Sequence, residues 1–141
     1  MASIRDFMAA LFKKILCPVD FDRVSIPALE MVQKIALETG AAVYLLYVVP
    51  GSSLPTDLEK VARDNLRGIA QKWLADKIAH EIVVSSGKPA AGIVSAPQTL
   101  TVDLIVMATH GRTGVDHSRL GTVAEQVIRL SSCPVVTVRP H

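Results

Sequence analysis

The stretch from Asp103 to Ile128, DLIVMATHGRTGVDHSRLGTVAEQVI, joins two different hydrophobic patterns through a polar loop. Its first apolar run stops at Met107 and does not alternate, which is typical of a strand that is buried on both faces. Glycines, histidines and two arginines follow, and a helix pattern begins at Gly121 and Thr122. The stretch therefore predicts a buried strand, a long loop and a helix in succession.

The same alternation of strand and helix patterns runs along the whole chain. The expected strands cover residues 13–20, 41–50, 80–87, 102–108 and 134–140. The expected helices cover residues 25–40, 56–77, 88–96 and 121–132. Such alternation implies parallel strands joined by right-handed crossovers. We therefore predict an α/β fold, a single-domain open five-stranded parallel sheet with helices on both faces.

Local signals predict how several of these helices begin, end and pack. Ser25 can cap the first of them, Pro27 suits its first turn and Gly40 can end it. Pro97 should end or kink the third helix at Ala96. The expected core faces are Ala28, Val32, Ile35 and Ala36 in the first helix, and Leu58, Val61, Ala62, Leu66, Ile69, Trp73 and Leu74 in the second.

Composition limits the class of protein. A chain of 141 residues fits one domain, and a formal charge of +2 without a dense basic cluster does not point to nucleic acid. The apolar runs are too short for the roughly 18 residues of a membrane span. Cys17 and Cys133 lie far apart and form no CxxC pair, which favours reduced thiols in a cytoplasmic protein.

The N-terminal residues 1–12 stand apart from the strand and helix alternation. Their apolar part, FMAALF, is shorter than the hydrophobic region of a signal peptide, and Asp6 precedes it. We interpret residues 1–12 as an amphipathic extension or a loosely ordered tail, and residues 13–141 as the domain.

The carboxyl ends of the first and fourth expected strands are the candidate ligand site. In open parallel sheets, ligands bind outside the carboxyl ends of the strands, where the strand order reverses. Asp20 follows the first strand and suits ribose hydroxyls, and the helix start at Gly121 and Thr122 suits a phosphate. The alternative is that TVAE, Thr122 to Glu125, is a capping box that needs no ligand.

Two common phosphate-binding motifs do not occur in this sequence. It contains no G-x-x-x-x-G-K-[ST], which argues against a Walker-type NTPase. No G-x-G-x-x-G follows the first expected strand, which argues against a dinucleotide site of the usual kind.

Together, KKILCPVDF, LLYVVP, GKPAAGIV and the stretch from Asp103 to Pro140 resemble the universal stress protein family. The nucleotide-binding motif of that family is G-x2-G-x9-G-[ST]. Here Ala108 stands in place of the first glycine, while Gly111, the nine-residue spacer, Gly121 and Thr122 all match. The resemblance implies strand order 3-2-1-4-5 and membership of the ATP-binding subclass. A methyl group at residue 108 costs little if the backbone there has negative φ and strains it if φ is positive.

The resemblance also implies the role of each site residue. Val48 would offer its backbone to adenine, Asp20 would meet the ribose, and a divalent ion such as Mg²⁺ would bridge the phosphates of ATP. The residues so implied are Pro18, Val19, Asp20, Val48, Met107, Ala108, His110, Gly111, Gly121, Thr122 and Val123.

The sequence leaves three functions open: a nucleotide-binding stress-response module, a slow ATPase, and an interaction protein without ligand. We favour the first, because phosphoryl transfer usually needs a lysine clamp and a placed base, and the loop offers only Asp116. The resemblance implies a homodimer through the edge strand, Pro134–Val138; the alternative is that the N-terminal extension covers that edge.

Overall fold

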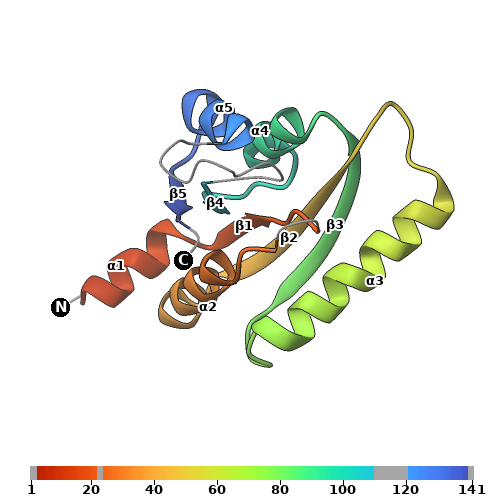
Figure 1. Cartoon of the computed structure of the whole chain (residues 1–141). Coiled ribbons are helices and arrows are strands. Elements are labelled where there is room, and N and C mark those ends of the chain that lie inside the picture. Colours follow the sequence, from red (N-terminus) through yellow and green to blue (C-terminus); the bar gives the residue numbers. More distant parts are fainter. Residues whose placement is uncertain (1–2, 22–23, 110–120, 140–141) are drawn as a thin grey trace.

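The computed structural model describes residues 3–21, 24–109 and 121–139 and confirms the predicted fold class. One sheet of five parallel strands has the order β3-β2-β1-β4-β5, with helices on both faces (Figure 1). The strands are β1 Lys14–Pro18, β2 Ala42–Pro50, β3 His80–Gly87, β4 Leu104–Ala108 and β5 Val135–Val138. The helices are α1 Ile4–Leu11, α2 Ile26–Thr39, α3 Thr56–Trp73, α4 Pro89–Thr99 and α5 Thr122–Leu130.

Two apolar layers hold the helices to the sheet. One layer joins α2 and α3 to one face, through buried side chains such as Val32 and Leu66 packed over Ile15 and Leu45. The other joins α4 and α5 to the opposite face, with Ile93, Val127 and Met107 among its members. Because β1, β2 and β4 are covered on both sides, their sequences are continuous apolar runs rather than alternating ones.

Helix α2 begins and ends where its sequence predicted. The Ser25 hydroxyl accepts a hydrogen bond from the backbone N–H of Ala28 at 3.3 Å, and a proline occupies the first turn. Gly40 closes the helix in the left-handed conformation, with φ of 75°, a conformation that costs glycine little. Ala28, Val32 and Ala36 are buried as expected, together with Leu29.

Helix α3 differs from its prediction in length and in burial. It ends at Trp73 rather than Lys77, and Leu58 and Val61 are 51% and 56% exposed instead of lying in the core. Its first turns project beyond the edge strand β3, so these two side chains have no sheet beneath them (Figure 1). Hydrophobic periodicity identified the face of the helix correctly but not how far the sheet extends under it.

Of the two effects predicted for Pro97, an end or a kink of the third helix at Ala96, the end is wrong. Helix α4 continues through Pro97 to Thr99, and Leu100 then donates its N–H to the Ala96 carbonyl at 2.8 Å. Proline removes one backbone donor, but burial of Ile93 and Ala96 holds this part of the chain against the sheet.

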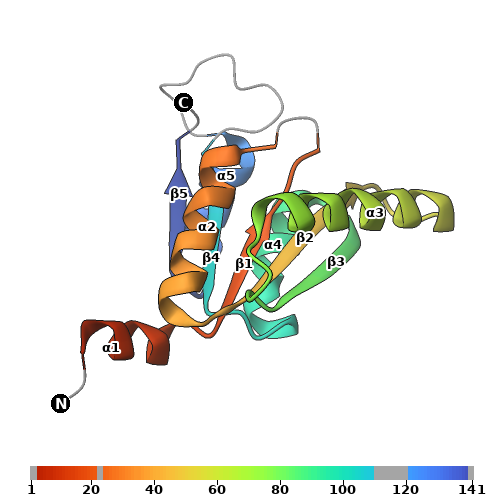
Figure 2. The same cartoon turned by 90° about the horizontal axis from the view of Figure 1, so that it is seen from below.

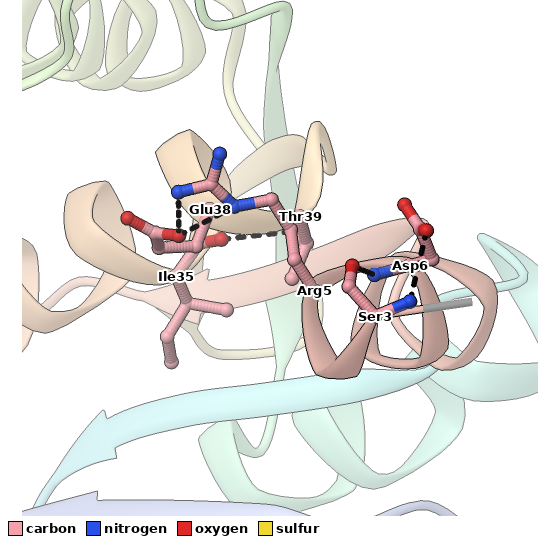
Figure 3. Close-up of polar contacts among 6 residues, drawn as sticks. All are labelled: Ser3, Arg5, Asp6, Ile35, Glu38 and Thr39. Atoms are coloured by element: carbon pink, nitrogen blue, oxygen red, sulfur yellow. Dashed lines mark hydrogen bonds and ion pairs between the residues drawn. The ribbon is translucent and has the colours of Figure 1, made fainter. Parts of the chain in front are cut away.

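The N-terminal extension contains an ordered amphipathic helix, α1, which confirms the first of its two interpretations. Ser3 and Asp6 form a reciprocal capping box with bonds of 3.1 Å, and Arg5 forms an ion pair of 2.7 Å with Glu38 of α2 (Figure 3). In Figure 2, α1 lies at the amino-terminal end of the strands, on the side opposite the start of α5. It is therefore remote from the candidate ligand site.

Both cysteines are free thiols. Burial raises the pKa of Cys17, which lies in the core, to about 12, and it also raises the pKa of the half-buried Cys133. Of the helices in the described residues, none combines the length and the hydropathy needed to cross a membrane.

Candidate functional site

Strands β1 and β4 separate toward their carboxyl ends. Within the described residues they pair only at Ile15 with Leu104 and at Leu16 with Ile105. In contrast, β1 stays paired with β2 as far as Pro18, and Val19 extends this pairing by donating its N–H to the Leu46 carbonyl at 2.8 Å. Figure 2 shows β1 leaning away from β4 and toward β2.

This separation lies at the point where the strand order reverses. The chain leaves β1 for α2 on one face of the sheet, and it leaves β4 for α5 on the other face. The two connections therefore diverge, and ligands of open α/β sheets bind at this kind of switch point.

The segment after β1 is held against β2 by an aromatic contact. The rings of Phe21 and Tyr47 have centroids 4.1 Å apart and an angle of 32° between their planes. Together with the Val19 bond, this contact fixes both ends of the segment that contains Asp20. Asp20 is half-buried there, directly beyond the carboxyl end of β1.

The backbone of Val48 points to the same side as that of Leu46. In a strand, alternate residues direct their peptide groups to the same edge. The Leu46 carbonyl accepts from Val19, so the Val48 carbonyl, two residues later, faces the region beyond the end of β1. Its side chain is buried in the layer beneath α4.

The chain segments on either side of residues 110–120 meet through a backbone bond. Gly121 donates its N–H to the Thr109 carbonyl at 2.6 Å, and Thr109 donates to the Val138 carbonyl of β5 at 3.0 Å. Thr109 is 4% exposed. The end of β4 and the start of α5 are therefore held side by side, which places Ala108 close to Gly121 and Thr122 in space.

Ala108 takes a backbone conformation that accommodates its methyl group. Thr101 is the one non-glycine residue with positive φ among those that the structure describes, so φ at Ala108 is negative. A side chain in place of the motif's first glycine therefore causes no backbone strain at this position. Met107, the preceding residue, points into the layer beneath α4 and α5 and is 5% exposed.

Helix α5 starts without a capping box, which was the alternative interpretation of TVAE. Gly121 is the N-cap residue, and no side chain bonds to the cap. Glu125 instead pairs with Arg129 at 3.1 Å. Thr122 is exposed and Val123 is half-buried against the core. The N–H groups of a helix's first turn have no intrahelical acceptor, so those of Thr122 and Val123 point outward at this end.

The amide of Gly121 has a different environment from the one expected. It already donates to Thr109, so it is not a bare donor for a phosphate. The absence of a side chain at Gly121 remains the feature that permits close approach to the helix start.

The structure brings most of the predicted residues to one edge of the sheet. Pro18, Val19, Asp20, Val48, Met107, Ala108, Gly121, Thr122 and Val123 all lie at or near the carboxyl ends of β1, β2 and β4. His110 and Gly111 lie outside the described residues. Within the described part of the chain, no cluster of three or more His, Cys, Asp or Glu side chains is arranged to hold a metal ion.

Sequence reasoning missed four residues that build this edge. Phe21 and Tyr47 position the segment around Asp20, and Thr109 joins β4 to α5. Gly92 of α4 allows this helix to approach Val48, because a Cβ atom at residue 92 would lie 2.8 Å from Val48 Cγ2. A glycine inside a helix pattern was the available signal for this last contact.

Comparisons with known proteins identify relatives that share the sequence pattern and the fold of this chain. The sequence model described as the Universal stress protein family matches residues 11–139. Universal stress protein MJ0531 of Methanocaldococcus jannaschii is 37% identical over 144 residues, covering 92% of this chain and 83% of that protein. The solved structure of MJ0577, from the same organism, superposes with a TM-score of 0.80 at 29% identity and covers 93% of this chain and 98% of the other.

Two further solved structures share the fold and were determined with adenine nucleotides. One is a universal stress protein in complex with cAMP, with a TM-score of 0.68, 18% identity and coverage of 93% and 99% of the two chains. The other is the universal stress protein from Archaeoglobus fulgidus in complex with dAMP, with a TM-score of 0.66, 22% identity and coverage of 92% and 99%. On the evidence of the family match, the chain belongs to the universal stress protein family.

Proposed function

We propose that this protein binds ATP at the carboxyl edge where β1 and β4 separate, and acts as a stress-response or signalling module with little or no turnover. The observation that carries this proposal is the divergence of the two strands, beside a helix start that has no side-chain cap. An uncapped helix start has outward N–H groups and a positive dipole end, which favour a phosphate.

The residues around this edge divide into contacts for the base, the sugar and the phosphates. The Val48 carbonyl and the apolar surfaces of Pro18 and Val19 suit the adenine ring. Asp20 suits the ribose hydroxyls as a hydrogen-bond acceptor. Thr122 and Val123 offer amides and a hydroxyl to phosphate oxygens, and we assign His110 and Gly111 to the same group from the motif.

The related structures support adenine as the recognised base. The protein solved with cAMP and the one solved with dAMP have this fold, and both ligands contain adenine and a phosphate group. Recognition through the adenosine part would be common to these ligands and to ATP. The resemblance of residues 108–122 to the motif of the ATP-binding subclass is what favours ATP among these nucleotides.

A divalent ion fits this proposal as a partner of the nucleotide rather than of the protein. Mg²⁺ commonly retains waters and is held by substrate phosphates with one or two carboxylates. The described residues form no multi-carboxylate metal site, so phosphate oxygens would supply most of its ligands. When bound, the ion would neutralise part of the phosphate charge.

We also propose that the protein is a homodimer that pairs through β5, in the cytoplasm. Within the described residues, β5 pairs with β4 on one side and with no other strand on its other side. Because the carbonyls of Pro134 and Val138 accept from β4 and Thr109, the peptide groups of Val135 and Thr137 face the open edge. We assign the domain to residues 13–141 and treat residues 1–12 as an added element.

Titration calorimetry with ATP and Mg²⁺ tests the nucleotide proposal. Asp20→Asn should weaken binding about tenfold or more, because the amide cannot accept from two ribose hydroxyls as a carboxylate does. Asp57→Asn, in the exposed first turn of α3, is the matched control and should leave the affinity unchanged. Equal affinities of the two variants, or no heat with wild type at millimolar ATP, would refute the proposed site. A parallel ATP turnover assay separates a binding module from a slow ATPase.

A further inference from the structure

Helix α1 presents an unpartnered apolar stripe. Ile4, Phe7, Met8 and Leu11 recur at the spacing of one helix face and are 77%, 57%, 36% and 48% exposed. The opposite side of the helix faces α2: Arg5 forms its ion pair with Glu38, and Ala9 is half-buried. Figure 3 shows Arg5 reaching from α1 to Glu38 of α2. The exposed stripe is therefore turned away from the rest of the chain rather than packed under the helix.

A helix of this kind needs a partner to be stable. It has 8 residues, all of them exposed or half-buried, and all of them within the described segment 3–21. Isolated helices of this length are marginal in water, and most helical stability in proteins comes from packing of the apolar face. The capping box and the Arg5 pair orient α1, but they leave its four large apolar side chains in water.

The position of α1 indicates which partner covers the stripe. Figure 2 shows α1 projecting past β5, on the side where the sheet ends, and Figure 1 places it on the same side of the sheet as α2. A second copy that pairs through β5 would occupy the space into which α1 projects. We propose that the α1 stripe packs against a second copy of this chain and clasps the dimer, an inference that rests on the proposed pairing through β5.

The complementary surface on the second copy follows from symmetry. Antiparallel pairing of two β5 strands places the amino end of one sheet beside the carboxyl end of the other, with both α2 helices on the same face. Helix α1 of one copy then points toward the start of α2 in the second copy. Two apolar residues of that region, Val24 and Ile26, are 37% and 43% exposed.

Interface area favours a second copy as well. Strand β5 has 4 residues, so pairing through this edge alone forms few hydrogen bonds. A stable dimer buries about 800 Å² of surface on each partner, which requires further contacts beside the strand. With about 200 Å² for each fully exposed side chain of this size, the stripe offers roughly 400 Å². The stripe thus offers about half of the area that a stable dimer buries on each partner.

A lipid surface is a poorer match for the stripe. Amphipathic helices that bind membranes carry lysine and arginine along their polar face. The polar residues of α1 are Arg5 and Asp6, whose charges cancel, so the helix has no excess of positive charge toward anionic lipids. The chemistry of α1 therefore favours a protein surface.

Sedimentation equilibrium of the full chain tests the inference with three variants. Ile4→Ser with Phe7→Ser removes the two most exposed side chains of the stripe and should raise the dimer dissociation constant about tenfold or more. Leu58→Ser with Val61→Ser removes two similarly exposed residues from the other end of the molecule and should change it less than twofold. Thr137→Pro removes a donor from the open edge without removing a bond to β4, and should weaken pairing through β5 itself.

The outcomes separate the clasp from the β5 dimer. A dimer weakened by Thr137→Pro but unaffected by the stripe variant would overturn the clasp and retain the edge pairing. A dimer weakened by the stripe variant alone would overturn pairing through β5, and with it the proposed packing of α1 on a copy paired in that way. A monomeric wild type at all concentrations, or loss of vesicle binding in the stripe variant with no change in mass, would overturn the clasp. Circular dichroism confirms that each variant is folded.

Discussion

Replacing Gly92 with alanine tests how closely helix α4 packs against β2, beside the candidate site. The new Cβ atom would lie 2.8 Å from Val48 Cγ2 and 3.6 Å from its Cγ1. Carbon atoms in contact prefer a separation of about 3.5–4.0 Å, so the nearer pair would overlap by about 0.7 Å or more. Val48 is 7% exposed and β-branched, so its side chain cannot easily rotate away.

Two opposing effects determine the size of the change. Alanine in place of glycine inside a helix stabilises it by about 1 kcal/mol. Overpacking of a rigid core contact costs about 1–3 kcal/mol. We therefore expect Gly92→Ala to lower the free energy of unfolding by about 1 kcal/mol, because the steric cost exceeds the gain in helix propensity.

Gly68 provides a matched control for this substitution. It lies inside helix α3, and a Cβ atom there would meet nothing within 4 Å. Gly68→Ala should therefore raise the free energy of unfolding by about 0.5–1 kcal/mol, from propensity alone. Urea denaturation of both variants, with equal m-values, measures the difference. If Gly92→Ala stabilises the protein as much as Gly68→Ala does, α4 does not approach β2 as closely as described.

Three further predictions concern the core, the start of β1 and the motif. Burial raises the pKa of the Cys17 thiol to about 12 from an ordinary 9.0, so the unfolded chain loses the thiol proton at a lower pH than the folded chain does. The free energy of unfolding should accordingly fall by about 1.4 kcal/mol per pH unit between pH 9 and 12, and thermal melts of Cys17→Ala should lack this part of the slope. The Asp103 carboxylate accepts from the backbone N–H groups of Lys13 and Lys14 at 3.0–3.2 Å; Asp103→Ala should cost about 1 kcal/mol in urea denaturation, and no loss would show these bonds to be dispensable. Ala108→Gly, which restores the full motif, should change ATP affinity by less than about threefold in calorimetry, because φ is already negative there; a tenfold gain would show that the methyl group obstructs the ligand.

The sequence predicted the architecture well because local rules determine it. Uninterrupted apolar runs identified buried strands, and Ser25 and Gly40 marked both ends of α2. These signals depend on residues close together in the chain. The reversal of strand order, which the family resemblance implied, then placed the carboxyl ends of β1 and β4 at one edge.

The features that were predicted wrongly or missed depend on distant neighbours. Leu58 and Val61 lie on the predicted face of α3, but the sheet ends before it reaches them. The capping box at Thr122 does not form, because the backbone enters α5 through the bond between Gly121 and Thr109. The contact between Phe21 and Tyr47 depends on the register of β1 against β2, and the hydrophobic periodicity of the sequence does not specify that register.

Mapping ATP onto the protein by amide chemical shifts is the most direct test of the proposed nucleotide site. The account predicts saturable shifts in ¹⁵N spectra at Val19, Asp20, Val48, Thr122 and Val123 on addition of ATP and Mg²⁺. Amides of α1 and of the exposed first turns of α3 should remain unchanged. Shifts confined to those distant helices, or none at millimolar ATP, would contradict the claim that the edge between β1 and β4 binds the nucleotide.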